Sequence, residues 1–165
     1  MSNKIWEFTG ETKIHLGTTL KRIRAAVEFK LKCGIVVVRG ELGGWIEKES
    51  NLSGNAWVSG DAWVYGNAKV SGDAWVSGNA WVSGNAEVSG NAEVKSSEDY
   101  CVYKNTWSSF RWFTYTRSNK MWSVGCFFGT GAELIAKAYK DSKKSGKCYE
   151  AIVKAQEAIE KEMEV

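Results

Sequence analysis

The strongest constraint on the fold is a repeat of six residues that runs from Asn51 to Val94. An aliphatic residue occupies every sixth position: Leu52, Val58, Val64, Val70, Val76, Val82, Val88 and Val94. An alanine follows each of the first seven after four residues, and every unit carries a Gly-Asn or Gly-Asp pair that suits a tight turn. Six residues are too few for two helices, whereas a short strand plus a turn fits well. The repeat therefore predicts a solenoid of short strands with the aliphatic and alanine side chains inside.

This pattern resembles the hexapeptide repeat of left-handed parallel β-helices, in which three hexads form one triangular coil. Trp45 and Ile46 are in phase with the repeat, so we expect the solenoid to begin near Gly44. The resemblance implies a mainly β fold: a left-handed parallel β-helix of about three coils. We expect a small N-terminal β cap over residues 1–43, the helix over 44–94, and a C-terminal α+β domain over 95–165.

The composition excludes few functions. The chain has 165 residues, 44% of them apolar, and a net charge of +3, which by itself gives no argument for nucleic acid. The four cysteines share no metal-ligand spacing and indicate reduced thiols rather than disulfides. No signal peptide or long apolar run is visible, so we expect a soluble protein of the bacterial cytoplasm with no membrane contact.

The N-terminal segment contains an ambiguous stretch. The sequence of residues 19–29, TLKRIRAAVEF, fits either a strand or a short helix. The strand interpretation is favoured, because the β-rich run Cys33–Val38 offers a partner.

The C-terminal segment predicts three strands, at residues 100–103, 110–116 and 121–128, of which the last two form a hairpin. Thr130 and Glu133 have the spacing of a capping box and predict a helix from that point. Ser145-Gly146 should end this helix, and a second should span Lys147–Met163. Together these elements predict a three-stranded sheet covered by two helices.

The segment TLKRIRA, followed by RGELGGWIEKESNLSGNAWV, resembles a family of phage and prophage proteins of uncharacterised function. The resemblance covers roughly residues 18–94. Residues 99–165, with VGCFFGT ahead of two helices, resemble the α+β tail that such proteins often carry. The resemblance implies a phage context and brings no known catalytic site.

The residue before each aliphatic position should point outward, and positions eighteen apart should stack on one face. The tryptophans concerned are Trp45, Trp63 and Trp81 on one face and Trp57 and Trp75 on another. The third face carries Asn51, Lys69 and Glu87. Exposed aromatic strips of this size indicate an interface, so we predict a homo-oligomer, a trimer more than a dimer, formed through the five tryptophans.

An enzymatic function has little support in the residues. Hexapeptide-repeat acyltransferases, by resemblance, use a histidine as general base, and the only histidine is His15, ahead of the repeats. The chain cannot supply the three histidines of a zinc-dependent carbonic anhydrase. We expect no catalytic residues, no metal and no cofactor. An acyltransferase-like enzyme with a non-standard site is the alternative.

A second predicted surface combines basic and aromatic side chains in the C-terminal domain: Arg111, Trp112, Tyr115, Arg117 and Lys120. Such side chains concentrate binding energy, so we assign partner binding to them. Single-stranded nucleic acid is an alternative partner, less favoured because these aromatics also suit a core. We therefore expect a non-catalytic, phage-derived binding protein, an oligomeric inhibitor or sequestering protein whose partner is a protein of the bacterial host, such as a defence component.

Overall fold

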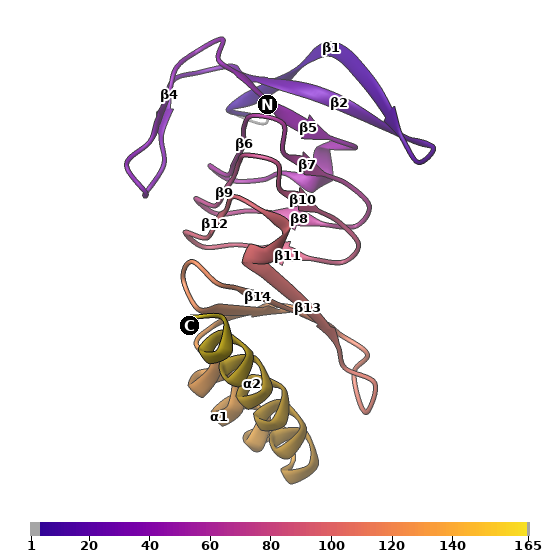
Figure 1. Ribbon diagram of the computed structural model, residues 1–165, viewed down its shortest axis with the longest axis vertical. Coiled ribbons are helices and arrows are strands. Elements are labelled where there is room, and N and C mark those ends of the chain that lie inside the picture. Colours follow the sequence, from indigo (N-terminus) through magenta and orange to yellow (C-terminus); the bar gives the residue numbers. More distant parts are fainter. Residues whose placement is uncertain (1–3, 165) are drawn as a thin grey trace.

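A computed structural model describes residues 4–164 of the chain. The molecule is elongated, and its three parts follow one another along the long axis (Figure 1). N-terminal strands form one end, stacked turns of chain form the middle, and a sheet with two helices forms the other end. We call residues 44–94 the repeat region.

Short parallel strands build the repeat region. They fall into three stacks: β5 (Leu42–Ile46), β7 (Trp63–Val64) and β10 (Trp81–Val82); β6 (Trp57–Val58), β9 (Trp75–Val76) and β12 (Glu93–Val94); and β8 (Lys69–Val70) with β11 (Glu87–Val88). The last stack is extended by a bridge from Leu52, which follows the 3-10 turn η1 (Glu49–Asn51). Partners lie eighteen residues apart, as in the pairing of Trp45 with Trp63 and of Trp63 with Trp81. Three hexads therefore complete one turn of the stack.

The interior of the repeat region contains the side chains that the repeat placed inward. All the valines and alanines of the pattern, together with Leu52, are at most 4% exposed, which confirms that prediction. Glycine makes the turns possible: Gly72 has a φ of +72°, in the left-handed region that a side chain disfavours. A continuous column of valine and alanine thus forms the larger of the two hydrophobic cores.

The prediction of a single left-handed parallel β-helix between a separate cap and a three-stranded sheet is wrong. Residues 4–164 form five sheets, mostly small, in which parallel and antiparallel pairs both occur. The parallel pairs belong to three different sheets, because each short strand pairs only with the strands eighteen residues before and after it. One of these sheets is mixed: β2 (Thr18–Ala25) pairs antiparallel with β5, on the edge that the first turn would otherwise leave open.

The N-terminal strands close that end of the molecule. β1 (Trp6–His15) and β2 form an antiparallel hairpin with an irregularity between Phe8 and Thr12. The strand interpretation of residues 19–29 is confirmed over most of its length, since Leu20 and Ile23 of β2 are fully buried. Its expected pairing with Cys33–Val38 is wrong, because β5 occupies that edge of β2. β4 (Val36–Val37) pairs instead with β3 (Phe29–Lys30).

The C-terminal sheet has four strands rather than the three predicted. The 3-10 turn η2 (Ser97–Asp99) leads into β13 (Tyr100–Lys104), and β14 (Trp112–Thr116), β15 (Met121–Val124) and β16 (Phe127–Gly129) follow as antiparallel neighbours. The predicted last strand is divided at Gly125, whose φ of +60° turns the chain back on itself. One face of the sheet touches the last turn of the repeat region, where the Glu87 amide donates to Thr114 Oγ1 over 2.8 Å.

Two helices cover the opposite face of this sheet. α1 (Gly131–Asp141) begins with the predicted capping box of Thr130 and Glu133, which is confirmed. The expected break at Ser145-Gly146 is wrong, because α2 (Lys143–Met163) already begins at Lys143. Ser142 is its N-cap, and its hydroxyl accepts from the Ser145 amide over 3.0 Å. Gly146 is buried inside α2 against the ring of Tyr139, where a Cβ would not fit, so its role is close helix packing.

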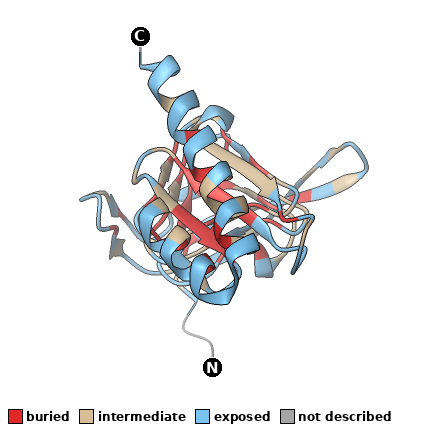
Figure 2. Cartoon of the chain, turned by 90° about the horizontal axis from the view of Figure 1, so that it is seen from below, coloured by how far each residue is buried: buried red, intermediate tan, exposed pale blue. Residues whose placement is uncertain are grey.

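The second hydrophobic core lies between the C-terminal sheet and the helices. Phe113, Trp122, Leu134 and Val153 are its most buried members. Seen along the long axis from the helical end, buried segments gather behind the helices, whose outer surfaces are exposed (Figure 2). None of the helices within residues 4–164 combines the length and the apolar character that crossing a bilayer requires.

Candidate functional site

A groove lies where the third stack of the repeat region meets the C-terminal sheet. It has a volume of about 420 Å³. Its lining residues are Lys48, Ser50, Asn67, Lys69, Asn85, Glu87, Arg111, Trp112 and Gly125. We call it the basic groove. One wall comes from successive turns of the repeat region and the other from the start of β14 and the turn after β15.

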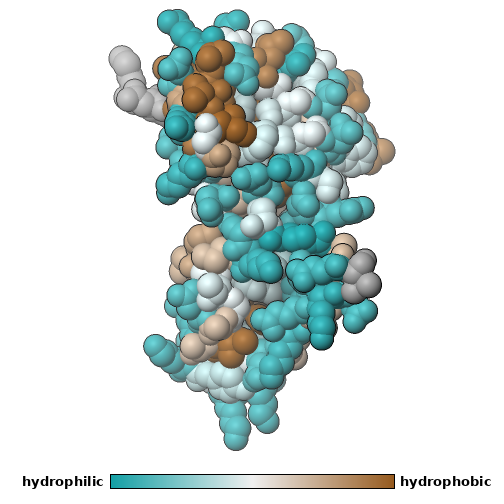
Figure 3. All heavy atoms as spheres, turned by 60° about the vertical axis from the view of Figure 1, so that its left-hand side comes forward, coloured by the Kyte–Doolittle hydropathy of each residue, from teal (hydrophilic) through white to brown (hydrophobic). Residues whose placement is uncertain are grey.

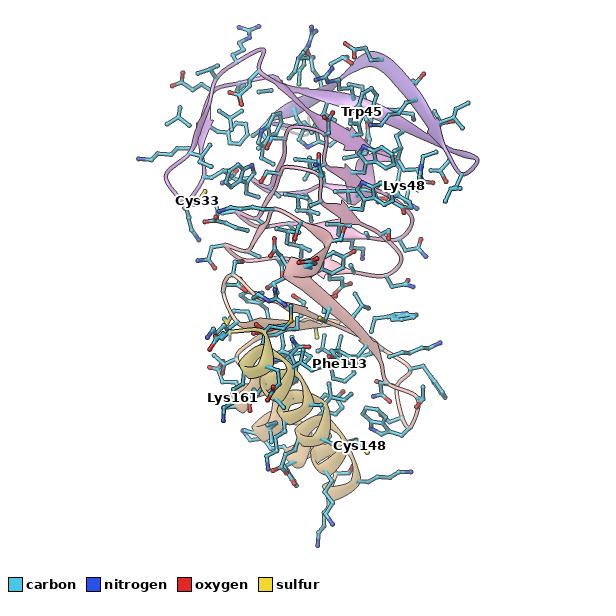
Figure 4. The ribbon with its side chains drawn as sticks, in the orientation of Figure 1. Cys33, Trp45, Lys48, Phe113, Cys148 and Lys161 are labelled. Atoms are coloured by element: carbon cyan, nitrogen blue, oxygen red, sulfur yellow. The ribbon has the colours of Figure 1, made fainter. Side chains whose placement is uncertain are left out.

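The wall formed by the repeat region is fixed by backbone hydrogen bonds. Lys69 on β8 donates its amide to the Ala86 carbonyl of the next turn over 2.9 Å. Lys48 belongs to the first turn (Figure 4), and its amide donates over 2.8 Å to Asn51 Oδ1. Asn51 was expected to point outward, but it is fully buried, and its Nδ2 donates to the Ala68 carbonyl. A buried amide therefore holds the backbone of the two lysine-bearing turns together.

The opposite wall belongs to the C-terminal sheet. Arg111 lies just before β14, and its carbonyl accepts from the Asn105 amide over 2.8 Å. Its side chain runs along Gly125, close enough that a Cβ there would lie 3.4 Å from Arg111 Cδ. Trp112 is 37% exposed, and the Lys104 ammonium lies 5.2 Å from the centroid of its ring. Arg111 and Trp112 thus present a guanidinium and an indole at one place.

The basic groove carries uncompensated positive charge. Within the described part of the chain, Lys48, Lys69 and Arg111 have no carboxylate within 4.0 Å, whereas Arg117 pairs with Glu160 over 3.1 Å. Among the described residues that line the groove, Glu87 is the only acidic one. Glu47, next to Lys48, binds the Gly66 amide instead. Three cations therefore face one carboxylate.

The structure brings only Arg111 and Trp112 together out of the five residues predicted to bind a partner. Tyr115 is 6% exposed and faces the helices; burial, with a contribution from Glu160, raises the pKa of its hydroxyl to about 12. Arg117 pairs with Glu160, and Lys120 lies 3.8 Å from Glu164. An extended strand advances about 3.3 Å per residue, so Arg111 and Arg117 lie at opposite ends of β14.

Lys69 and Glu87 were expected on a polar third face of the repeats, but this wall of the basic groove was not predicted to be a binding site. A signal was present: Asn67 with Asn85, and Lys69 with Glu87, are eighteen residues apart and so occupy equivalent places on successive turns. The Asn67 amide indeed donates to Asn85 Oδ1 over 3.5 Å. What could not be found was the meeting of this column with Arg111, because that depends on how the C-terminal sheet docks.

The first predicted tryptophan ladder is partly covered by the β1–β2 hairpin. Trp63 and Trp81 stack with centroids 4.8 Å apart and planes 4° from parallel. The Lys13 ammonium lies 4.1 Å from the centroids of both Trp45 and Trp63, so one cation faces two indoles. Trp81, at the end of the ladder, is 42% exposed.

The second predicted ladder, Trp57 and Trp75, is more deeply buried than the first. Trp57 is 1% exposed and lies beneath Phe29, 5.6 Å away between ring centroids. Trp75 is half-buried, and its Nε1 donates to Ser59 Oγ over 2.8 Å. Trp57 belongs to the protein's own core, and Trp45, Trp63 and Trp75 are half-buried. Trp81 is therefore the one exposed tryptophan of the five. The predicted oligomer interface stays a prediction.

His15, the residue on which the acyltransferase alternative depends, lies in an aromatic environment. Its ring meets Trp63 edge-on at 4.6 Å and Trp81 at 5.2 Å. Its Nε2 has no hydrogen-bond partner among the described residues, whereas a general base is normally oriented by one. Nothing in this geometry favours the acyltransferase alternative.

Exposed aliphatic side chains gather at the N-terminal end. Val27, Val36, Val38 and Leu42 are each between 44% and 50% exposed. A hydrophobic patch is visible at that end of the surface (Figure 3). Val36 and Val38 belong to the predicted strand segment Cys33–Val38, but their exposure was not predicted. In the structure β4 pairs only with β3, in a two-stranded sheet.

The remaining candidate chemistry is sparse. No group of three or more His, Cys, Asp or Glu side chains within residues 4–164 is arranged to hold a metal ion. The four cysteines are free thiols, two of them exposed. Comparisons of the chain with family models, with curated proteins and with solved structures gave no match. The basic groove and its charges are therefore the features of the described residues that indicate a function.

Proposed function

We propose that this chain is a non-catalytic binding protein that sequesters or inhibits an anionic component of a bacterial host. The basic groove carries the proposal: three cations without ion-pair partners are held in one concave place by hydrogen-bonded backbone. Like charges along one groove repel one another and create a positive potential, so an anion that binds among them relieves this repulsion.

The rigidity of both walls supports a binding role. The Glu87 amide bonds to Thr114, and Ser89 Oγ lies 2.7 Å from Ser123 Oγ, so the C-terminal sheet is attached to the last turn of the repeat region. A site whose walls are already fixed loses little conformational entropy when it binds. The resemblance of residues 18–94 to phage and prophage proteins supports a host component as the target.

Affinity capture from a bacterial lysate tests this proposal. The test variant changes Lys48, Lys69 and Arg111 to glutamine, which removes the charge and leaves a shorter, polar side chain at each position. The matched control changes Lys143, Lys144 and Lys147 to glutamine. These are three exposed lysines on α2 with no ion pair among the described residues, so the net charge changes equally.

Native mass spectrometry of the recovered protein, together with proteomic analysis of the eluate, identifies what is captured. We expect the wild-type chain and the α2 control to retain the same component and the groove variant to lose it. Equal capture by all three proteins would contradict the proposal. Circular dichroism confirms that each variant is folded.

A further inference from the structure

We propose that the ligand of the basic groove is a nucleotide: its phosphate groups bind Lys48, Lys69 and Arg111, and its base stacks on Trp112. This inference rests on the proposed function, since it names the ligand class of the same groove. Four features of the groove indicate a nucleotide: its volume, the arrangement of its cations, its exposed indole and the side-chain amides of its asparagines.

The volume favours a small molecule over a folded partner. Ligand pockets commonly enclose about 300–1,000 Å³, and the groove has about 420 Å³ between two walls. A folded protein usually covers roughly 800 Å² of its partner in a stable complex, which a groove of this size does not provide. An acidic side chain of a protein could enter it, but would use only part of the space.

The cations suit phosphate. Lys48 and Lys69 extend from consecutive turns of the repeat region, which neighbouring parallel strands space about 4.8 Å apart. Arg111 adds a planar guanidinium from the opposite wall, a group that can donate two parallel hydrogen bonds to phosphate oxygens. Two ammonium groups and one guanidinium together match an anion that carries two or more negative charges, such as a diphosphate.

The uncharged part of the lining suits a base. Trp112 lines the groove and is 37% exposed, and aromatic side chains such as its indole commonly stack on nucleic-acid bases. Asn67 and Asn85 place side-chain amides along the same wall, and their mutual bond of 3.5 Å leaves donors and acceptors for a base edge. Glu87 can accept from a ribose hydroxyl or an amino group.

Isothermal titration calorimetry with ADP, pyrophosphate and hexaglutamate tests the inference. ADP carries both phosphate and base, pyrophosphate carries the phosphates alone, and hexaglutamate stands for an acidic peptide. We expect ADP to bind roughly tenfold more tightly than pyrophosphate because of stacking on Trp112. Hexaglutamate should bind more weakly than either.

Two variants separate the contributions. Trp112→Ala should weaken ADP by roughly tenfold and leave pyrophosphate unchanged. The glutamine variant of Lys48, Lys69 and Arg111 should weaken both by roughly 100-fold, since three charge-assisted contacts are lost. Phe110→Ala, an exposed aromatic residue outside the groove lining, is the matched control and should change neither affinity.

The results also separate this inference from the proposed function. If ADP does not bind, if hexaglutamate binds as tightly, or if Trp112→Ala leaves the ADP affinity unchanged, the nucleotide assignment is wrong. The proposed function survives that result whenever lysate capture still depends on the three groove cations. If capture is independent of these cations, the proposed function fails as well.

Discussion

At the scale of single residues, Tyr115 shows how a side chain that suggests binding becomes part of the core. Its ring lies 5.1 Å from that of Trp122 between centroids, and the residue is only 6% exposed. Burial and the nearby Glu160 raise the pKa of this hydroxyl to about 12, against the opposing effect of Arg117. The folded chain therefore keeps the proton over a range in which the unfolded chain loses it.

This difference predicts a pH dependence with a defined sign. Between pH 10 and about 12 the unfolded state binds fewer protons than the folded state, so the free energy of unfolding falls as the pH rises through this window. Tyr115→Phe removes the ionisable group. We expect it to change stability little at pH 8 and to remove about 1.4 kcal/mol of the loss by pH 11.

Urea unfolding at pH 8, 10 and 11 measures the effect, and circular dichroism provides the signal. If the free energy of unfolding falls equally with pH in the wild type and in Tyr115→Phe, the raised pKa of Tyr115 is contradicted. The pKa values of Tyr100 and Tyr103 are also raised by burial, so a smaller slope should persist in the variant.

At the scale of elements, the turns of the repeat region decide how closely consecutive turns can stack. Gly72 and Gly84 have nearly equal φ values, +72° and +66°. They differ in what lies beneath them. A Cβ at Gly72 would lie 2.9 Å from the Gly90 carbonyl oxygen of the next turn, whereas one at Gly84 would meet nothing within 4 Å.

This pair gives a matched prediction. Gly84→Ala should cost about 1 kcal/mol, which is the cost of a side chain in the left-handed region. Gly72→Ala should cost about 1–3 kcal/mol more, because the contact is with backbone that cannot rotate away. Urea unfolding of the two variants measures the difference. Equal destabilisation would show that the stacking of these two turns is looser than the structure describes.

At the scale of the whole molecule, the flanking elements determine which parts of the repeat region stay exposed. The hairpin of β1 and β2 covers much of one tryptophan ladder, and Phe29 near β3 covers Trp57. Trp81 remains 42% exposed beside the partly covered His15. Trp81 is therefore the residue on which the predicted self-association through the tryptophans would depend.

We predict that Trp81→Ser lowers the oligomeric state of the protein in solution, since it removes the exposed ring of the ladder. Sedimentation velocity at micromolar concentration measures this. Trp57→Phe serves as a control: the residue is buried, so this change should affect stability and leave the oligomeric state alone. If the wild-type chain sediments as a monomer, the predicted self-association through Trp81 is wrong.

The sequence by itself determined the interior of this protein. A period of six with valine and alanine at fixed places allows only short strands and turns, and every one of those side chains is buried. The capping box at Thr130 and the strands around β14 were also readable, because such signals depend on neighbouring residues.

Only the tertiary structure decided the sheets and the site. Whether β2 adds to the first turn, which tryptophans are covered, and where Arg111 meets Lys69 all depend on how segments far apart in the sequence dock. Docking is governed by the shape and burial of whole surfaces, which a local pattern does not encode. The repeat fixed what lies inside, and the packing of the two flanks fixed what remains outside.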